Sequence, residues 1–274
     1  MSTKGWLAGL AHLSATGTRA VLATIVTVRG HSPRDVGAKM AVSAEATYGS
    51  IGGGNMEATI IDSAREMLTQ HERANGDYPH VETLEFGLNE HARNHHGTQC
   101  CGGVVEVLLE HVPAPPVIAV FGLGHVGEEI ARILSRHDAN LHLTDSRADI
   151  LGPRTVEVIT GGHANVTLHN PPAPEIVLDQ LPPGAHVLIL THDHAEDLTL
   201  CDAALRHGRL ASIGVIGSRA KWLRFRKKLL ELGHSEAAVE TIHSPIGVQD
   251  ISGKHPAVIA VSVAADLLRI LTKA

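Results

Sequence analysis

Apolar residues in the second half of the chain form short continuous runs separated by stretches with helical spacing. The pattern predicts strands at 117–121, 140–144, 185–190 and 210–215, and helices at 128–136 and 257–271. Short apolar runs that alternate with helices are typical of parallel strands joined by crossover helices. We therefore predict an α/β fold class for residues 117–274, with a Rossmann-like doubly wound parallel sheet.

The first half of the chain has a different pattern. It predicts a short amphipathic helix over 4–16, strands at 21–28, 39–43 and 104–109, and a helix with apolar residues at Ile60, Ile61, Ala64 and Leu68. Residues 70–80 are polar and loop-like. We expect a smaller α/β or α+β domain over 1–111, separated from the second domain by the proline-rich linker 112–116.

Composition restricts the function classes without choosing among them. The 274 residues carry a formal net charge of −6, and 43% are hydrophobic. Basic residues gather only at 219–228, which argues against a nucleic-acid surface. No apolar run of 18 residues and no signal-peptide pattern occur, so a cytoplasmic protein without membrane contact is expected. Three cysteines, two of them adjacent, do not form a disulfide framework.

The sequence FGLGHVG at 121–127 is the strongest motif. Gly122 permits a tight turn, Gly124 allows close approach of a pyrophosphate, and Gly127 lets the helix pack on the strand. Asp145 follows the next strand, where a carboxylate meets ribose hydroxyls in NAD-binding proteins. The motif indicates the fold more strongly than the ligand, because the same glycines also serve a domain that binds no NAD.

Two other segments are candidate anion sites. Gly52, Gly53 and Gly54 open a helix, where backbone amides can cradle a phosphate, and the loop with Arg34 follows a neighbouring strand. Arg219 and Lys221 follow a Gly-Ser helix start. For each segment the alternative is an ordinary turn with solvated side chains.

Polar residues also follow the strand at 185–190. His192, His194 and Asp197 are candidate metal ligands or acid–base groups. The alternative is a capped helix start with Asp193 as N-cap.

Cys100 and Cys101 stand in the sequence QCCGG. Their spacing matches no zinc motif, and vicinal cysteines cannot easily both ligate one tetrahedral ion. A thiolate beside glycine amides, acting as a soft metal ligand or a sulfur-handling group, is one interpretation. A buried pair of free cysteines is the other.

Together these segments resemble the XdhC/CoxI family of xanthine dehydrogenase accessory proteins, and its XdhC branch in particular. The matching strings, in order, are SPRDVGAKM, GSIGGGNMEA, QCCGG, FGLGHVG, TDSR, THDHAEDL, IGSRAK and SPIGVQDISGKHPAVIAVSVAA.

The resemblance implies a non-enzymatic maturation chaperone. It would bind the molybdenum cofactor, as molybdopterin or its dinucleotide form, protect it while a cysteine desulfurase supplies sulfur, and deliver it to the large subunit of apo-xanthine dehydrogenase. A homodimer is left open. Cys100 and Cys101 would serve the molybdenum or sulfur end. The expected phosphate or pterin contacts, together with the other candidate cofactor residues, are Arg34, Gly52, Gly53, Gly54, Gly122, Gly124, Gly127, Asp145, His192, Arg219 and Lys221.

Two features depart from the family pattern. Position 55 is Asn where many members carry His, and 89–97 is longer and richer in histidine than expected. Two rival functions remain: an NAD(P)-dependent oxidoreductase and a dinucleotide-sensing regulatory module. The oxidoreductase leaves the triple glycine and the cysteine pair without a role, and no Tyr-x-x-x-Lys sequence is present.

Overall fold

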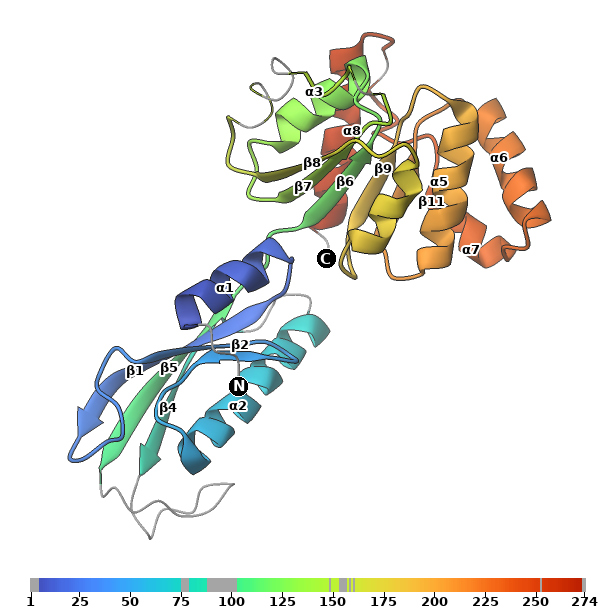
Figure 1. The fold of residues 1–274 in the computed structure, drawn as a ribbon. Helices are drawn as coiled ribbons and strands as arrows, with labels where there is room; N and C mark the ends of the chain where they lie inside the picture. Colours follow the sequence, from blue (N-terminus) through green and yellow to red (C-terminus); the bar gives the residue numbers. More distant parts are fainter. Residues whose placement is uncertain are drawn as a thin grey trace. The chain divides into compact units, whose positions relative to one another are not determined.

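The protein folds into two compact units, which divide between Ala114 and Pro115 (Figure 1). The computed structural model describes residues 5–74, 79–87, 103–147, 149–152, 157, 159, 161–251 and 253–272. Within these ranges, none of the helices is both long enough and apolar enough to span a lipid bilayer.

The second unit is built on a six-stranded parallel sheet in the order β11-β10-β9-β6-β7-β8. Its strands are β6 (Val117–Phe121), β7 (Asn140–Thr144), β8 (Asn165–His169), β9 (His186–Ile189), β10 (Ser212–Val215) and β11 (Ile242–His243). Numbered within the unit, this is the 3-2-1-4-5-6 order of Rossmann folds. The winding reverses between β6 and β9, so the ligand crevice of such folds is expected at their carboxyl ends.

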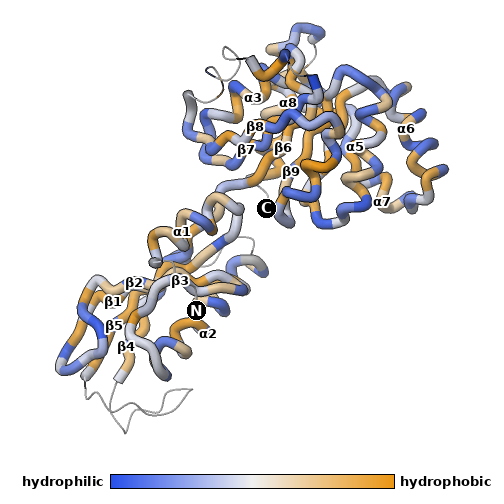
Figure 2. The backbone as a smooth tube through the Cα atoms, viewed as in Figure 1, coloured by the Kyte–Doolittle hydropathy of each residue, from blue (hydrophilic) through white to orange (hydrophobic). Residues whose placement is uncertain are grey.

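Both faces of this sheet are covered, as the doubly wound prediction requires. Phe121 in β6 faces a core with η1 (Pro174–Gln180), α5 (His194–His207), α6 (Arg219–Glu231) and α7 (Glu236–Glu240). Val120 faces the opposite core with α3 (His125–Leu134) and α8 (Pro256–Leu271). Figure 2 shows the resulting hydrophobic character of β6 and β9. All five β6 residues are buried, which explains the continuous apolar run.

The first unit is a five-stranded antiparallel sheet in the order β3-β2-β1-β5-β4. Its strands are β1 (Ala20–Arg29), β2 (Lys39–Val42), β3 (Thr47–Gly49), β4 (Val81–Gly87) and β5 (Val104–Val112). The helix α2 (Gly54–Arg73) packs on one face through residues including Met56, Ile60 and Met67. The short helix α1 (Trp6–Ala15) packs through Leu13 against Ala20, Ala41 and Tyr48.

The predicted fold class is confirmed, whereas several boundaries differ. The helix α2 continues to Arg73 inside the segment expected to be loop, and β5 extends to Val112 at the start of the expected linker. The helix expected at 128–136 begins at His125 and ends at Leu134. The strands β3, β4, β8 and β11 were not predicted. In β4 only Phe86 is buried, so this edge strand lacks the apolar run that identifies a central strand.

Candidate functional site

The glycine turn between β6 and α3 lies at the point where the winding reverses. Gly122 has φ +99°, and a Cβ atom there would lie 2.3 Å from the Leu190 carbonyl oxygen. A Cβ atom at Gly127 would lie 2.0 Å from the Gly122 carbonyl oxygen. Both distances are far below any real contact, so these two positions require glycine for the turn and for helix packing, as the motif predicts.

Gly124 differs because no described residue fills the space beside it. Its φ of −65° suits any residue, and the nearest atom to a Cβ there would be Arg147 Nη2, at 3.9 Å. Gly124 is also the N-cap of α3, and no side chain among the described residues caps this helix. Unpaired amides and the positive end of the helix dipole therefore meet open space beside a guanidinium group, which suits a phosphate.

Two other helices that begin at this edge of the sheet, α5 and α6, are capped by their own residues. The Asp193 carboxylate accepts a hydrogen bond of 2.8 Å from the Ala195 amide at the start of α5. Ser218 Oγ accepts one of 3.2 Å from the Lys221 amide at the start of α6. The sequence left open whether Asp193 is an N-cap, and the structure confirms that it is.

The Asp145 side chain holds the glycine turn in position through hydrogen bonds. It is 3% exposed, and its carboxylate accepts hydrogen bonds from the Leu123 amide at 2.7 Å and from Arg147 Nη2 at 2.8 Å and Nε at 2.9 Å. Burial alone raises the pKa of Asp145, but the bonds from Arg147 and Leu123 outweigh it and lower the pKa below its ordinary value. A ribose hydroxyl would have to displace one of these donors.

The Lys221 ammonium group is likewise bonded to other groups of the protein. Its Nζ donates to the Asp197 carboxylate and, at 2.8 Å, to the Ile216 carbonyl oxygen, and both charged side chains are buried. The other Asp197 oxygen accepts from the Thr191 amide at 2.9 Å and from Thr191 Oγ1 at 2.8 Å. This pair ties the loop after β9 to the start of α6, a role that the sequence reading did not foresee for Lys221.

Arg219 and His192 are exposed at the same edge of the sheet. Among the described residues, no hydrogen bond or ion pair engages the Arg219 guanidinium, so it is available to an anionic ligand. Of the predicted residues, the second unit thus brings Gly122, Gly124, Gly127 and Asp145 into one turn. It places His192, Arg219 and Lys221 at neighbouring strand ends.

The triple glycine of the first unit encloses a carboxylate from its own helix. Gly52, Gly53 and Gly54 all have positive φ. Glu57 Oε2 accepts from Ser50 Oγ at 2.6 Å and from the amides of Ile51 and Gly53 at 3.0 Å each. The amide of Gly53, which was expected to help cradle a phosphate, therefore already has an internal anionic partner, as does the amide of Ile51.

The loop with Arg34 lies against these glycines, as expected from its position after β1. A Cβ atom on Gly52 would lie 2.7 Å from Pro33 Cγ and 3.4 Å from Arg34 Cγ. Arg34 itself is exposed. A Cβ atom on Gly103 would lie 2.2 Å from the His31 carbonyl oxygen, so the residue that follows QCCG packs on the same loop. Cys100 and Cys101 lie outside the described residues.

Sequence reasoning missed two residues, Arg147 and Glu57. Arg147 stands two positions after Asp145 in the TDSR string, where a cation so near a strand end was a usable signal. Glu57 stands in the first turn of α2, where an acidic side chain can reach back to the preceding amides, as in a capping box.

The fold and these loops define a Rossmann-type domain with an uncapped glycine turn, preceded by a small antiparallel α/β unit. Residues 118–267 match the XdhC Rossmann domain, and residues 13–81 match the XdhC and CoxI family. The first match alone spans more than half of the chain. The chain therefore belongs to the XdhC family.

One individual relative and two solved structures are also similar to this chain. The Escherichia coli protein YqeB, described as uncharacterized, is 27% identical over 254 residues, which are 92% of this chain but only 44% of YqeB. A Bacillus halodurans crystal structure titled as a xanthine dehydrogenase aligns over 97% of this chain and 96% of its own, with 18% identity and a TM-score of 0.47. The E. coli tRNA N6-threonylcarbamoyladenosine dehydratase aligns over 58% of this chain and 87% of its own, with 15% identity and a TM-score of 0.42.

Proposed function

We propose that this chain is a xanthine dehydrogenase accessory protein that binds the molybdenum cofactor and delivers it to the apoenzyme. Membership of the XdhC family supports this role. The observation that carries the binding step is the N-terminus of α3. In the described part of the chain, Gly124 leaves open space there, no side chain caps the helix, and Arg147 lies alongside. The cofactor is an anionic pterin phosphate, and these groups suit its phosphate.

In this proposal the charged residues of the Rossmann edge divide into two groups. The pairs Asp145–Arg147 and Asp197–Lys221 hold the loops in position, because their charges are largely satisfied within the protein. Arg147 also presents its guanidinium beside Gly124, so it serves both purposes. Arg219 is the exposed cation that would contact the ligand. Lys221 is thus proposed to position the site rather than to bind phosphate.

The first unit carries the cysteine pair, for which a separate role is proposed. Cys100 and Cys101 are proposed as molybdenum or sulfur ligands, and Arg34 as a further cation. The supporting observation is that Gly103, two positions after Cys101, packs on the loop that carries Arg34. Because Glu57 occupies the amides of Ile51 and Gly53, the triple glycine is proposed to shape this loop rather than to grip a phosphate through those amides.

The partners are proposals of the same kind. The large subunit of apo-xanthine dehydrogenase would receive the cofactor, and a cysteine desulfurase would supply its terminal sulfur. This chain spans less than half the length of YqeB, so nothing about the complete activity of that protein is transferred.

Binding of NAD(P) is the competing function, since the 3-2-1-4-5-6 strand order is shared with dinucleotide-binding proteins. The engagement of Asp145 by Arg147 and Leu123 disfavours it, because the carboxylate that would hold the ribose is already bonded. Anaerobic titration of the purified protein with the molybdenum cofactor and, separately, with NADH distinguishes the two. We expect saturable cofactor binding without NADH binding; tight NADH binding without cofactor binding would reject the proposal.

A further inference from the structure

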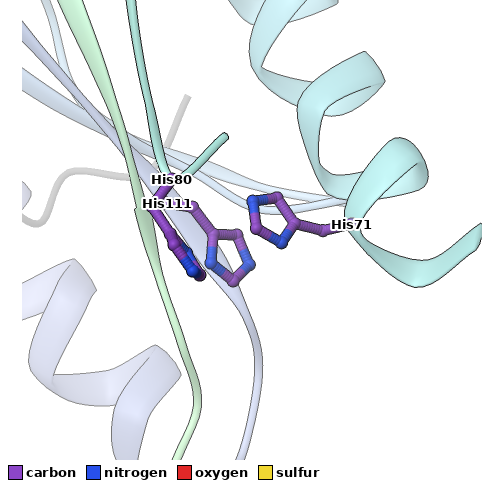
Figure 3. Close-up of side chains that lie close together, drawn as sticks. All are labelled: His71, His80 and His111. Atoms are coloured by element: carbon purple, nitrogen blue, oxygen red, sulfur yellow. The ribbon is translucent and has the colours of Figure 1, made fainter. Parts of the chain in front are cut away.

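Three histidines meet at the end of the first unit's sheet that lies away from the triple glycine (Figure 3). His71 belongs to the last turn of α2, His80 precedes β4, and His111 lies in β5. The His111 amide donates a hydrogen bond of 2.7 Å to the His80 carbonyl oxygen, which fixes these two residues beside each other. The helix then brings His71 over the pair.

The three imidazole rings form a compact group. One ring nitrogen from each residue lies within 4.8 Å of the other two. The rings of His71 and His111 are stacked, with centroids 3.8 Å apart and planes 10° from parallel, and the centroid of His80 is 4.9 Å from that of His71. His71 and His111 are buried and His80 is exposed, so the group opens to solvent on one side.

His111 is a buried histidine that lacks side-chain hydrogen bonds in the part of the chain that the structure describes. It is 9% exposed, and neither of its ring nitrogens has a hydrogen-bond partner within the described residues. A buried imidazole normally finds such a partner, so an unpartnered one calls for a ligand. Imidazole nitrogen is a common ligand of metal ions.

His71 is oriented by the backbone of the same cluster. Its Nε2 lies 3.1 Å from the Pro79 carbonyl oxygen, which can only accept a hydrogen bond. His71 Nε2 is therefore the donor in this bond, and Nδ1 is the other ring nitrogen. A histidine that donates one ring nitrogen to a carbonyl while the other bears the lone pair is the usual arrangement of a metal ligand.

We propose that His71, His80 and His111 bind one zinc ion, with a water molecule in the fourth position on the exposed side. Three imidazoles with an open position form a recognised tetrahedral zinc site. Ligand nitrogens on such an ion lie roughly 3.4 Å apart, so the widest nitrogen separation must close by about 1.4 Å. Because the rings of His71 and His111 are parallel, one of them must turn about χ2, a soft torsion for histidine.

This site is independent of the proposed cofactor function. His111 pairs with Val21 near the start of β1, whereas Val104, beside Gly103 and the Arg34 loop, pairs with Arg29 at the end of β1. Seven residues of β5 separate the two positions, which is about 23 Å along the strand. The histidines therefore do not share a site with the triple glycine, and either proposal can fail without the other.

The test is zinc binding by the full chain after chelator treatment, measured by competition with a chromophoric chelator. The chain has 20 histidines, so matched variants are essential. His80→Ala removes the exposed ligand without opening the core, and we expect it to bind zinc at least tenfold more weakly at this site. His137→Ala removes an exposed histidine of the second unit and should bind as the wild type does. A Cys100→Ser, Cys101→Ser variant should also retain the site.

Cobalt substitution identifies the ligands. The wild type should show the visible bands of a tetrahedral cobalt ion without thiolate charge transfer, and His80→Ala should lose them. Zinc should raise the melting temperature of the wild type but not of His80→Ala, because a ligand of the folded state stabilises it. Equal zinc affinity in the wild type and His80→Ala, or cobalt bands with thiolate character that vanish in the cysteine variant, would overturn the proposal. The pterin content of His80→Ala should equal that of the wild type.

Discussion

Replacement of Gly124 by alanine should weaken cofactor binding at least tenfold while leaving the fold intact. The added Cβ atom would meet no protein atom closer than 3.9 Å, and the φ of −65° suits alanine. Alanine is a poorer N-cap than glycine, and this difference lowers the stability by about 1 kcal/mol. Alanine also reduces the conformational entropy of the unfolded chain, which raises the stability by about 0.4–1 kcal/mol. The net change in unfolding free energy should therefore stay below about 1 kcal/mol.

The effect on binding should be larger. A phosphate oxygen bonded to the α3 amides lies about 2.9 Å from nitrogen, whereas a methyl group at Gly124 would keep it further away. We expect affinity for the molybdenum cofactor to fall at least tenfold, or about 1.4 kcal/mol. Anaerobic titration gives the affinity, and thermal unfolding gives the stability. A shift in melting temperature of no more than about 4 °C is expected for a domain of this size.

Two other glycines provide matched controls. Gly5 is also the uncapped N-cap of a helix, with φ −62° and no atom within 4 Å of a Cβ, so Gly5→Ala should change neither binding nor stability appreciably. In Gly127→Ala the new Cβ atom would lie 2.0 Å from the Gly122 carbonyl oxygen, and the strain should cost about 1–3 kcal/mol. If Gly124→Ala binds the cofactor as tightly as the wild type, the N-terminus of α3 is not the phosphate site.

Three further predictions concern the residues that hold the loops. Asp197→Ala leaves the buried Lys221 ammonium without its carboxylate, so the unfolding free energy measured in urea should fall by about 3–5 kcal/mol. A fall of less than about 1 kcal/mol would contradict the role of this ion pair in holding the loops. The pKa of Asp145 is lowered in the folded state, so its ionised carboxylate contributes fully to stability above pH 3.8 and loses that contribution as the pH falls further. In Asp145→Asn the unfolding free energy should depend less on pH in this acidic range. An unchanged pH dependence in the variant would contradict the role assigned to Asp145. Glu57→Ala leaves the amides of Ile51 and Gly53 unpaired and should lower the unfolding free energy by about 2–3 kcal/mol, and Glu57→Gln should lower it less. Equal stability of the wild type and both variants would contradict these hydrogen bonds.

The sequence predicted those parts of the fold that local pattern determines. The run Val117–Phe121 is apolar throughout because the strand is buried on both faces, and the glycines after it are required by contacts of 2.0–2.3 Å. The edge strand β4 escaped prediction because only one of its side chains is buried. Its position is determined by pairing with β5, a contact between distant residues that no local pattern records.

The candidate site was predictable in composition but not in its internal bonds. Glycines and cations at strand ends identified the edge of the sheet, yet their spacing carried no information on which charges neutralise each other. Lys221 is satisfied by Asp197, 24 positions earlier, and the amide of Gly53 is satisfied by Glu57. Such pairings depend on side-chain geometry in the folded protein. The cluster of His71, His80 and His111 escaped notice for the same reason, since its members are far apart in the sequence.

The most direct measurement is the pterin content of the protein after anaerobic purification from cells that make the molybdenum cofactor. Oxidation of a bound molybdopterin yields a fluorescent pterin that can be quantified against the protein. We predict close to one pterin per chain for the wild type and for Gly5→Ala, and little for Gly124→Ala. Wild-type protein that carries no pterin under these conditions would contradict the proposal that this chain carries the cofactor.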